Sequence, residues 1–172
     1  MVNSSIPYHN VGISQIGFSI PQSYVDINEL AEARGIIPDK LTKGLGLKKM
    51  AVCKEDETID VLIANALEDL WRNSANHGDT LDSFLKDVDR IYLGTESAID
   101  GAKPSVTYGL NTLSKRFDFD YSHIDVVDLT FACIGAVDAL HNCIDYVRLN
   151  LTRKCIVVAR YQYHPRQSLC WL

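Results

Sequence analysis

Short apolar segments alternate with amphipathic ones along this chain, and this alternation constrains the fold more than any other feature. Apolar runs of about six residues are typical of buried strands, whereas apolar residues spaced by three and four are typical of helices. The strands are predicted at Asp89–Thr95, Ile124–Leu129 and Lys154–Ala159, and the helices at Thr58–Trp71, Pro104–Lys115 and Ala132–Arg148. Strands that alternate with helices predict an α/β layered fold with a mostly parallel central sheet flanked by helices.

The chain before the first of these elements has weaker signals. Val11–Ile20 is predicted as a strand, and Asp26–Arg34 as a helix. Asp26 is the expected N-cap of that helix, and Glu29 three residues later completes a pattern similar to a capping box. Lys43–Leu47, which two glycines interrupt, is predicted as a loop, and the polar stretch Asn73–Asp82 as a surface connection.

Composition excludes several classes of partner. The 172 residues are 47% hydrophobic and 23% charged with a net charge of −5, which suits one soluble globular domain or one lobe of a larger protein. Without a cluster of Lys and Arg, we expect no nucleic-acid partner. No apolar run approaches the roughly 20 residues that span a bilayer, and Met1–Asn10 lacks the features of a signal peptide, so we expect a cytoplasmic protein without a membrane partner.

The cysteines are predicted to be reduced thiols. There are five of them, an odd number, and none forms a CxxC pair: Cys53, Cys133, Cys143, Cys155 and Cys170. Neither a disulfide framework nor a zinc site fits this pattern, and no metal is expected.

Cys133 is the first candidate functional residue. It follows the strand Ile124–Leu129 after a short turn and precedes a helix of small residues. Backbone N–H groups and the helix dipole favour a thiolate at such a position, and the same donors can hold an oxyanion. A strand–turn–Cys–helix pattern is therefore typical of an acyl-transfer nucleophile. The alternative is a buried structural cysteine, because free Cys is among the most buried residue types.

Glu96 is the second candidate. It directly follows the strand Asp89–Thr95, and parallel strands would bring it to the same sheet edge as Cys133. A carboxyl group in a partly apolar pocket there would suit a residue that takes and gives a proton. Alternatively, Glu96 caps the next turn or pairs with Lys103. Asp100 is interpreted as a local hydrogen-bonding residue, and His123 and His141 as surface or packing residues: these three are not assigned to the site.

Several blocks of sequence together resemble the 3-hydroxy-3-methylglutaryl-CoA synthase family. They follow the family's order and spacing from about Val11 to Ala159, and the Thr-Glu-Ser-x-x-Asp and Ala-Cys blocks are the most specific. The blocks are Tyr24–Asp26, Leu30–Arg34, Lys43–Gly46, Met50–Val52, Gly94–Asp100 with Lys103, and Phe131–Cys133.

The resemblance implies a thiolase-like fold and the condensation of acetyl-CoA with acetoacetyl-CoA in the mevalonate pathway of isoprenoid biosynthesis. In the family a Cys takes the acetyl group as a thioester and a Glu acts as general acid/base during C–C bond formation; the matching residues here are Cys133 and Glu96. CoA thioesters are then substrates, no separate cofactor is implied, and the full-length form is implied to be a homodimer.

The chain also departs from the family. A full member is more than twice as long, because the thiolase-like fold has two similar halves, and the His that binds the acetoacetyl thioester comes from the second half. Residues 1–159 are predicted to be the N-terminal synthase domain, and residues 160–172 an aberrant tail that a frameshift or a truncation would explain. We therefore expect this fragment alone to be inactive.

Other functions stay open at this stage. One alternative is a non-catalytic remnant, or a lobe that pairs with another protein. Another is a polyketide β-branching synthase or other thiolase-like acyltransferase, which would use an acceptor bound to a carrier protein.

Overall fold

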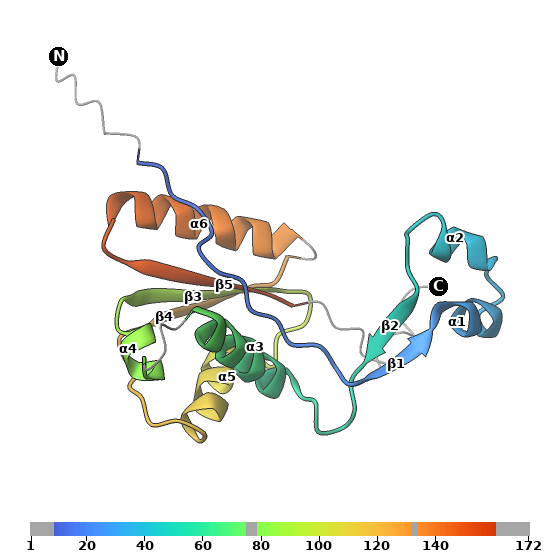
Figure 1. Cartoon of the computed structure of the whole chain (residues 1–172), viewed down its shortest axis with the longest axis horizontal. Helices are drawn as coiled ribbons and strands as arrows, with labels where there is room; N and C mark the ends of the chain where they lie inside the picture. The colour runs from blue at the N-terminus through green and yellow to red at the C-terminus, as the bar shows by residue number, and fades with distance from the viewer. Residues whose placement is uncertain (1–8, 75–78, 132–133, 161–172) are drawn as a thin grey trace, which may run out of the picture.

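A parallel sheet of three strands, in the order β4-β3-β5, lies at the centre of the main body (Figure 1). The computed structural model describes residues 9–74, 79–131 and 134–160. In it, β3 (Val88–Thr95) is the middle strand, and it pairs in parallel with β4 (Asp125–Leu129) and β5 (Lys154–Arg160). Because β3 has neighbours on both sides and helices over both faces, it is buried along most of its length.

Helices cover both faces of this sheet. The helices α3 (Ile59–Ser74), α4 (Leu81–Leu85) and α5 (Ser105–Ser114) lie on one face, and α6 (Gly135–Leu149) lies on the other (Figure 1). The side chains of β3 alternate, so Ile91 and Leu93 pack into the large core with α3 and α5, whereas Tyr92 packs in a smaller cluster with α6. The layered α/β fold predicted from the sequence is therefore confirmed.

The strands and long helices of this body begin and end within a few residues of the predicted positions. The spacing of apolar residues in α3 is explained by its packing, since Ile63 and Leu67 are buried against the sheet and α5. Pro104 is the N-cap of α5, where its missing N–H costs no hydrogen bond.

The strand predicted at Val11–Ile20 is wrong. All ten residues of this segment are described and none is in a strand, and Ile16, Phe18 and Ile20 are exposed. The segment runs past α3 (Figure 1), and Phe18 N donates a hydrogen bond to Asp69 Oδ2 of that helix at 2.9 Å. The alternation of apolar residues is present, but no described strand pairs with it.

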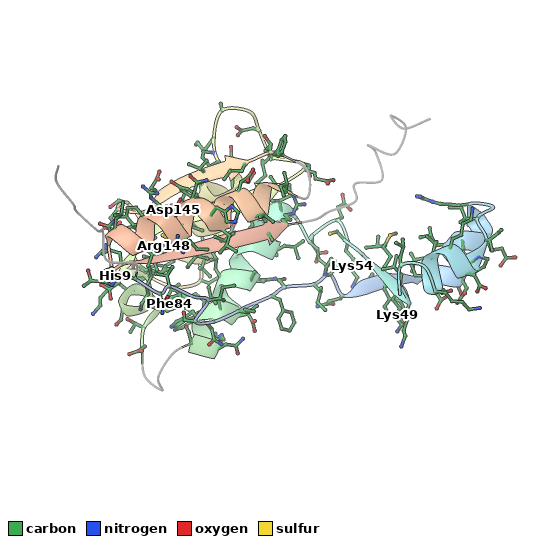
Figure 2. All side chains as sticks on the ribbon, turned by 90° about the horizontal axis from the view of Figure 1, so that it is seen from above. His9, Lys49, Lys54, Phe84, Asp145 and Arg148 are labelled. Atoms are coloured by element: carbon green, nitrogen blue, oxygen red, sulfur yellow. The ribbon has the colours of Figure 1, made fainter. Side chains whose placement is uncertain are left out.

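A separate small unit projects from the body, as Figures 1 and 2 show. It consists of the antiparallel strands β1 (Ser23–Asp26) and β2 (Lys49–Val52), which are joined through α1 (Ile27–Ala33) and α2 (Pro38–Thr42). The helix predicted after Asp26 is confirmed as α1, and Asp26 caps it by accepting from Asn28 N at 2.8 Å. The loop predicted at Lys43–Leu47 is confirmed, whereas β1, β2 and α2 were not predicted.

The predicted surface connection Asn73–Asp82 falls partly on residues 75–78, which lie outside the described part of the chain. Its far end is helical: α4 begins at Leu81, and Thr80 Oγ1 accepts a hydrogen bond from Ser83 N at 3.1 Å. Such a cap is typical of a helix start. Among the described residues, no helix is both long enough and apolar enough to cross a membrane.

Candidate active site

The carboxyl ends of all three strands of the central sheet meet at one edge. Gly94 of β3 is opposite Leu129 of β4, and Thr95 is opposite Arg160 of β5. Glu96 follows β3 directly at this edge. This confirms that the segments carrying the two candidate residues leave neighbouring parallel strands at the same edge.

The start of α6 packs directly against the end of β3. A Cβ atom added to Gly94 would lie 2.1 Å from Ala136 N, and one added to Gly135 would lie 2.4 Å from Leu129 O. Neither distance is compatible with a side chain, so two glycines permit the close approach of helix and strand. This contact fixes the first turn of α6 beside the backbone that leads into Glu96.

We expect Gly94→Ala to lower the free energy of unfolding by about 3 kcal/mol, because the new methyl group would overlap backbone atoms that cannot rotate away. Gly101→Ala is the matched control: nothing lies within 4 Å of a Cβ added there, and the residue is exposed in a loop. Urea unfolding followed by circular dichroism measures both. Equal stabilities of the two variants would show that α6 and β3 are not packed so closely.

Cys133 lies outside the described residues, together with Ala132. On either side of this gap, Phe131 O accepts a hydrogen bond from Gly135 N at 3.1 Å. Phe131 is 65% exposed and Ile134 is 43% exposed. The role of Cys133 as the nucleophile therefore stays a prediction.

The turn that carries Glu96 is held by its neighbours. The side chain of Thr95 is buried, and its hydroxyl accepts a hydrogen bond from Ser97 N at 3.1 Å. Glu96 itself is exposed, so the described residues do not form the partly apolar pocket that we expected around its carboxyl group. The described contacts of Lys103 include its backbone N–H to Asp100 and its Nζ above the Tyr108 ring.

Asp100 is the local hydrogen-bonding residue that the sequence indicated. Its Oδ1 accepts from Ala102 N at 2.7 Å and from Lys103 N at 2.6 Å, and its Oδ2 accepts from the Tyr108 hydroxyl. These hydrogen bonds, with that from Tyr108 the strongest, hold the pKa of Asp100 below its usual value. Asp100 therefore shapes the loop between Glu96 and α5.

A second network ties this loop to β4, and sequence reasoning missed it. Asp128 Oδ2 accepts from Ser105 N at 2.7 Å, and Ser105 Oγ accepts from Ile99 N at 2.9 Å. Ser105 is fully buried. The sequence signal for this network is Asp128, an acidic residue inside the apolar run of β4. A carboxylate that is partly buried there needs a hydrogen-bond donor.

Arg160 is a further residue at the edge, and the sequence placed it in the aberrant tail. It is the last residue of β5, and its Nη1 donates to Ser97 O at 3.3 Å. Burial lowers the pKa of its guanidinium, and the buried Nε and Nη2 atoms have no hydrogen-bond partner within the described part of the chain. Arg160 thus links the end of β5 to the residue after Glu96.

Among the other described cysteines, Cys143 and Cys155 lie away from these strand ends, whereas Cys53 is close enough to Arg160 for the two to interact electrostatically. Cys143 is buried in the middle of α6, and Cys155 lies near the start of β5. Burial raises the pKa of Cys53. His123 contacts Leu85 O through Nε2 at 3.3 Å, and His141 is exposed on α6. Cys170 is not among the described residues.

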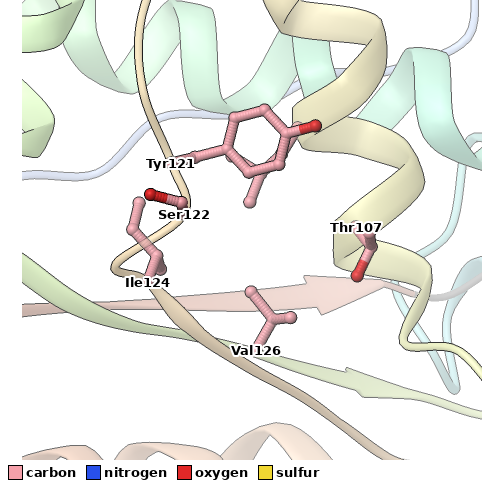
Figure 3. Close-up of a pocket in the computed structure, with 6 residues that line it drawn as sticks. Thr107, Tyr121, Ser122, Ile124 and Val126 are labelled. Atoms are coloured by element: carbon pink, nitrogen blue, oxygen red, sulfur yellow. The ribbon is translucent and has the colours of Figure 1, made fainter.

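A cavity of about 210 Å³ lies elsewhere, between α5 and the start of β4 (Figure 3). Its lining residues are Thr107, Leu110, Tyr121, Ser122, Ile124 and Val126. None of them lies at the carboxyl end of a strand, so the cavity is distinct from the candidate site. The described parts of the chain hold no group of three or more side chains that could bind a metal ion.

Comparison with solved structures defines the class of fold. The chain is similar to a β-ketoacyl-[acyl carrier protein] synthase III from Thermus thermophilus, with a TM-score of 0.65 and 24% identity, over 87% of this chain and 42% of that one. The similarity confirms the thiolase-like α/β fold, to which the observed sheet and its flanking helices correspond.

The family follows from closer similarities. The profile described as "Hydroxymethylglutaryl-coenzyme A synthase N terminal" matches residues 7–161. Hydroxymethylglutaryl-CoA synthase A from Dictyostelium discoideum is 32% identical over 155 residues, which are 87% of this chain and 30% of the relative. A structure of MvaS in complex with 3-hydroxy-3-methylglutaryl coenzyme A has a TM-score of 0.69 and 26% identity, over 92% of this chain and 36% of that one. The chain belongs to the hydroxymethylglutaryl-CoA synthase family, and it spans about a third of the length of these relatives.

Proposed function

We propose that this chain supplies one side of an acyltransferase site of the hydroxymethylglutaryl-CoA synthase type. The observation that carries the proposal is the edge where β3 and β4 end side by side, with Glu96 directly after β3 and the first turn of α6 packed on Gly94. Membership of the family supports acetyl-CoA and acetoacetyl-CoA as the substrates. No separate cofactor is part of the proposal.

In this proposal Cys133 is the nucleophile. Its thiolate attacks the carbonyl carbon of acetyl-CoA, the C–S bond to CoA breaks, and the acetyl group stays on the sulfur as a thioester. Backbone N–H groups at a helix start would stabilise both the thiolate and the oxyanion that forms during attack. The described part of α6, which begins at Gly135, has this orientation toward the strand ends.

Glu96 is the proposed general acid/base of the second step. It would take a proton from the methyl group of the acetyl thioester, so that this carbon can attack the ketone of acetoacetyl-CoA. Thr95 and Ser97 fix the backbone on both sides of Glu96 through the Thr95 hydroxyl. Because its backbone is held and its side chain is exposed, Glu96 can contact a substrate that binds at the surface of this chain.

Three broader assignments belong to the same proposal. We assign residues 1–159 to the synthase domain and residues 160–172 to a tail that departs from the family. A full-length protein of this family that includes the chain would be a homodimer. It would act in the cytoplasm, in the mevalonate pathway, as supported by a relative from Gallus gallus that is named "Hydroxymethylglutaryl-CoA synthase, cytoplasmic".

Labelling with a thiol electrophile near neutral pH should modify Cys133 before Cys53 or Cys143. A helix start lowers the pKa of a thiol, whereas burial raises the pKa of Cys53, and the interaction with Cys155 together with burial raises that of Cys143. Mass spectrometry of the digested chain locates the adduct, and Cys133→Ala should remove this adduct. Faster modification of Cys53 or Cys143 would refute the assignment of the nucleophile.

A second candidate function is a lobe that works only when paired with another polypeptide. The exposed apolar side chains around the start of α6 favour it: Phe131, Ile134 and Val137 all face solvent beside the strand ends. Exposed apolar groups that cluster in this way are typical of a surface that another protein covers. Gel filtration of the chain alone and with the remaining part of a family member distinguishes a monomer from such a complex.

A further inference from the structure

Two cysteine thiols lie together between α6 and β5. Cys143 is only 4% exposed and belongs to a small buried cluster with Tyr92 and Ala139, against which Cys155 packs. The two thiols are close enough to influence one another's ionisation: the interaction between them raises the pKa of Cys143 and lowers that of Cys155. Cys155 is half-buried on β5, a strand at the edge of the described sheet, so a small reagent can approach it.

A guanidinium group lies beside both thiols. Arg90 of β3 is opposite Cys155 in the sheet register, and its positive charge lowers the pKa of both cysteines. The group is held in place, since Arg90 Cζ lies 3.8 Å from the centre of the Tyr146 ring. An adjacent cation of this kind favours the thiolate form, which is the form that attacks disulfides.

The negative charges near Cys155 are occupied by other partners. Asp89 disfavours the Cys155 thiolate, but its carboxylate accepts from Arg153 Nε at 2.8 Å and from the Tyr146 hydroxyl at 2.5 Å. These hydrogen bonds, with that from Arg153 the strongest, lower the pKa of Asp89 to about 2. The solvent side of α6 carries its own pair, Asp145 and Arg148, as Figure 2 shows.

The pair is separate from the candidate active site. Cys143 lies in the middle of α6 and Cys155 near the start of β5, whereas Glu96 and the first turn of α6 lie at the opposite, carboxyl end of the strands. The proposed acyl transfer uses neither thiol. A role for the pair therefore does not depend on the proposed function.

We propose that Cys143 and Cys155 form a dithiol–disulfide site that a small disulfide, such as glutathione disulfide, oxidises. The Cys155 thiolate attacks one sulfur of glutathione disulfide, which forms a mixed disulfide and releases one glutathione. Cys143 loses its proton to solvent and attacks the Cys155 sulfur, which releases the second glutathione and leaves a bond between α6 and β5. Each protein thiol loses one hydrogen, and the oxidant is reduced to two thiols.

The test is to incubate the folded chain with excess glutathione disulfide, block the remaining thiols, and map the products by mass spectrometry. Digestion by trypsin together with a protease that cleaves before Asp places Cys143 in residues 138–144 and Cys155 in residues 155–160, apart from Cys133. We expect these two peptides to be joined in most of the chain, without bound glutathione, and to separate after dithiothreitol. Cys53 serves as the internal control, because a single half-buried thiol should only accept glutathione.

Two variants report the order of the steps. Cys143→Ala should trap glutathione on Cys155, whereas Cys155→Ser should leave Cys143 reduced, because its thiol is buried. The mapping of the unchanged chain decides the proposal without either variant. Glutathione retained on Cys155, or two free thiols at these positions while Cys53 has reacted, would overturn it.

Discussion

The 172-residue chain by itself should show no turnover of acetyl-CoA and acetoacetyl-CoA. The described residues leave the candidate site open on one side: Glu96, Phe131 and Ile134 are all exposed at the edge where the strands end. Condensation requires that two thioesters be held in register while an oxyanion is stabilised, and a displacement of about 1 Å can already cost roughly 10²-fold in rate. A site that is open on one side should lose far more than about 10²-fold in rate.

The measurement follows the loss of the acetoacetyl-CoA enolate absorbance with purified chain. A longer protein, in which this chain is joined to the remaining two thirds of a relative, is the positive control. Cys133→Ala in both proteins identifies turnover that depends on the proposed nucleophile. If the short chain shows turnover that Cys133→Ala abolishes, it builds a complete site by itself or by self-association, and our prediction is wrong.

In the longer protein, Glu96→Ala should separate the two chemical steps. Glu96 would move protons during condensation and not during acetyl transfer to the thiol, so the overall rate should fall by about 10²-fold or more while formation of the acetyl-enzyme is largely kept. Labelled acetyl-CoA measures the first step by the label bound to protein. The absorbance assay measures the whole reaction.

Glu29→Ala is the matched control for this variant. Glu29 is also an exposed carboxylate, but it lies on α1 in the projecting unit, away from the strand ends (Figure 1). Both steps should stay unchanged in that variant. An equal loss of both steps in Glu96→Ala, or no loss of either, would show that the general acid/base is a different residue.

The elements predicted well from the sequence are those whose pattern is set by burial on a defined face. The runs of β3, β4 and β5 are apolar because helices cover the sheet on both sides, and α3 repeats every three to four residues because one face meets the core. The strand prediction was wrong for Val11–Ile20, where apolar residues alternate but no described strand pairs with the segment. A period of two reveals an extended chain, but it does not reveal what pairs with it.

The candidate site was predicted in part. Glu96 was proposed because a carboxylate directly after a buried strand is conspicuous, and its role stays a prediction. The structure confirms that β3 and β4 end side by side, with Gly94 packed on the start of α6. Asp128 and Ser105 were missed because their roles depend on a contact between residues far apart in the chain. The exposure of Glu96 was not foreseen either, because a local sequence does not say which surfaces remain uncovered.

The position of β3 in the middle of the sheet has a consequence for synthesis. Both strands that pair with β3 follow it in the sequence, so β3 leaves the ribosome before either partner exists. The strands β1 and β2 can pair before the central sheet forms, because they are near one another in the chain. Parallel pairing between distant segments is slow, and the unpaired backbone N–H and C=O groups along both edges of β3 can bind wrong partners during that interval. The emergence of β5 therefore sets the time at which the nascent chain can complete the burial of β3, which is buried along most of its length.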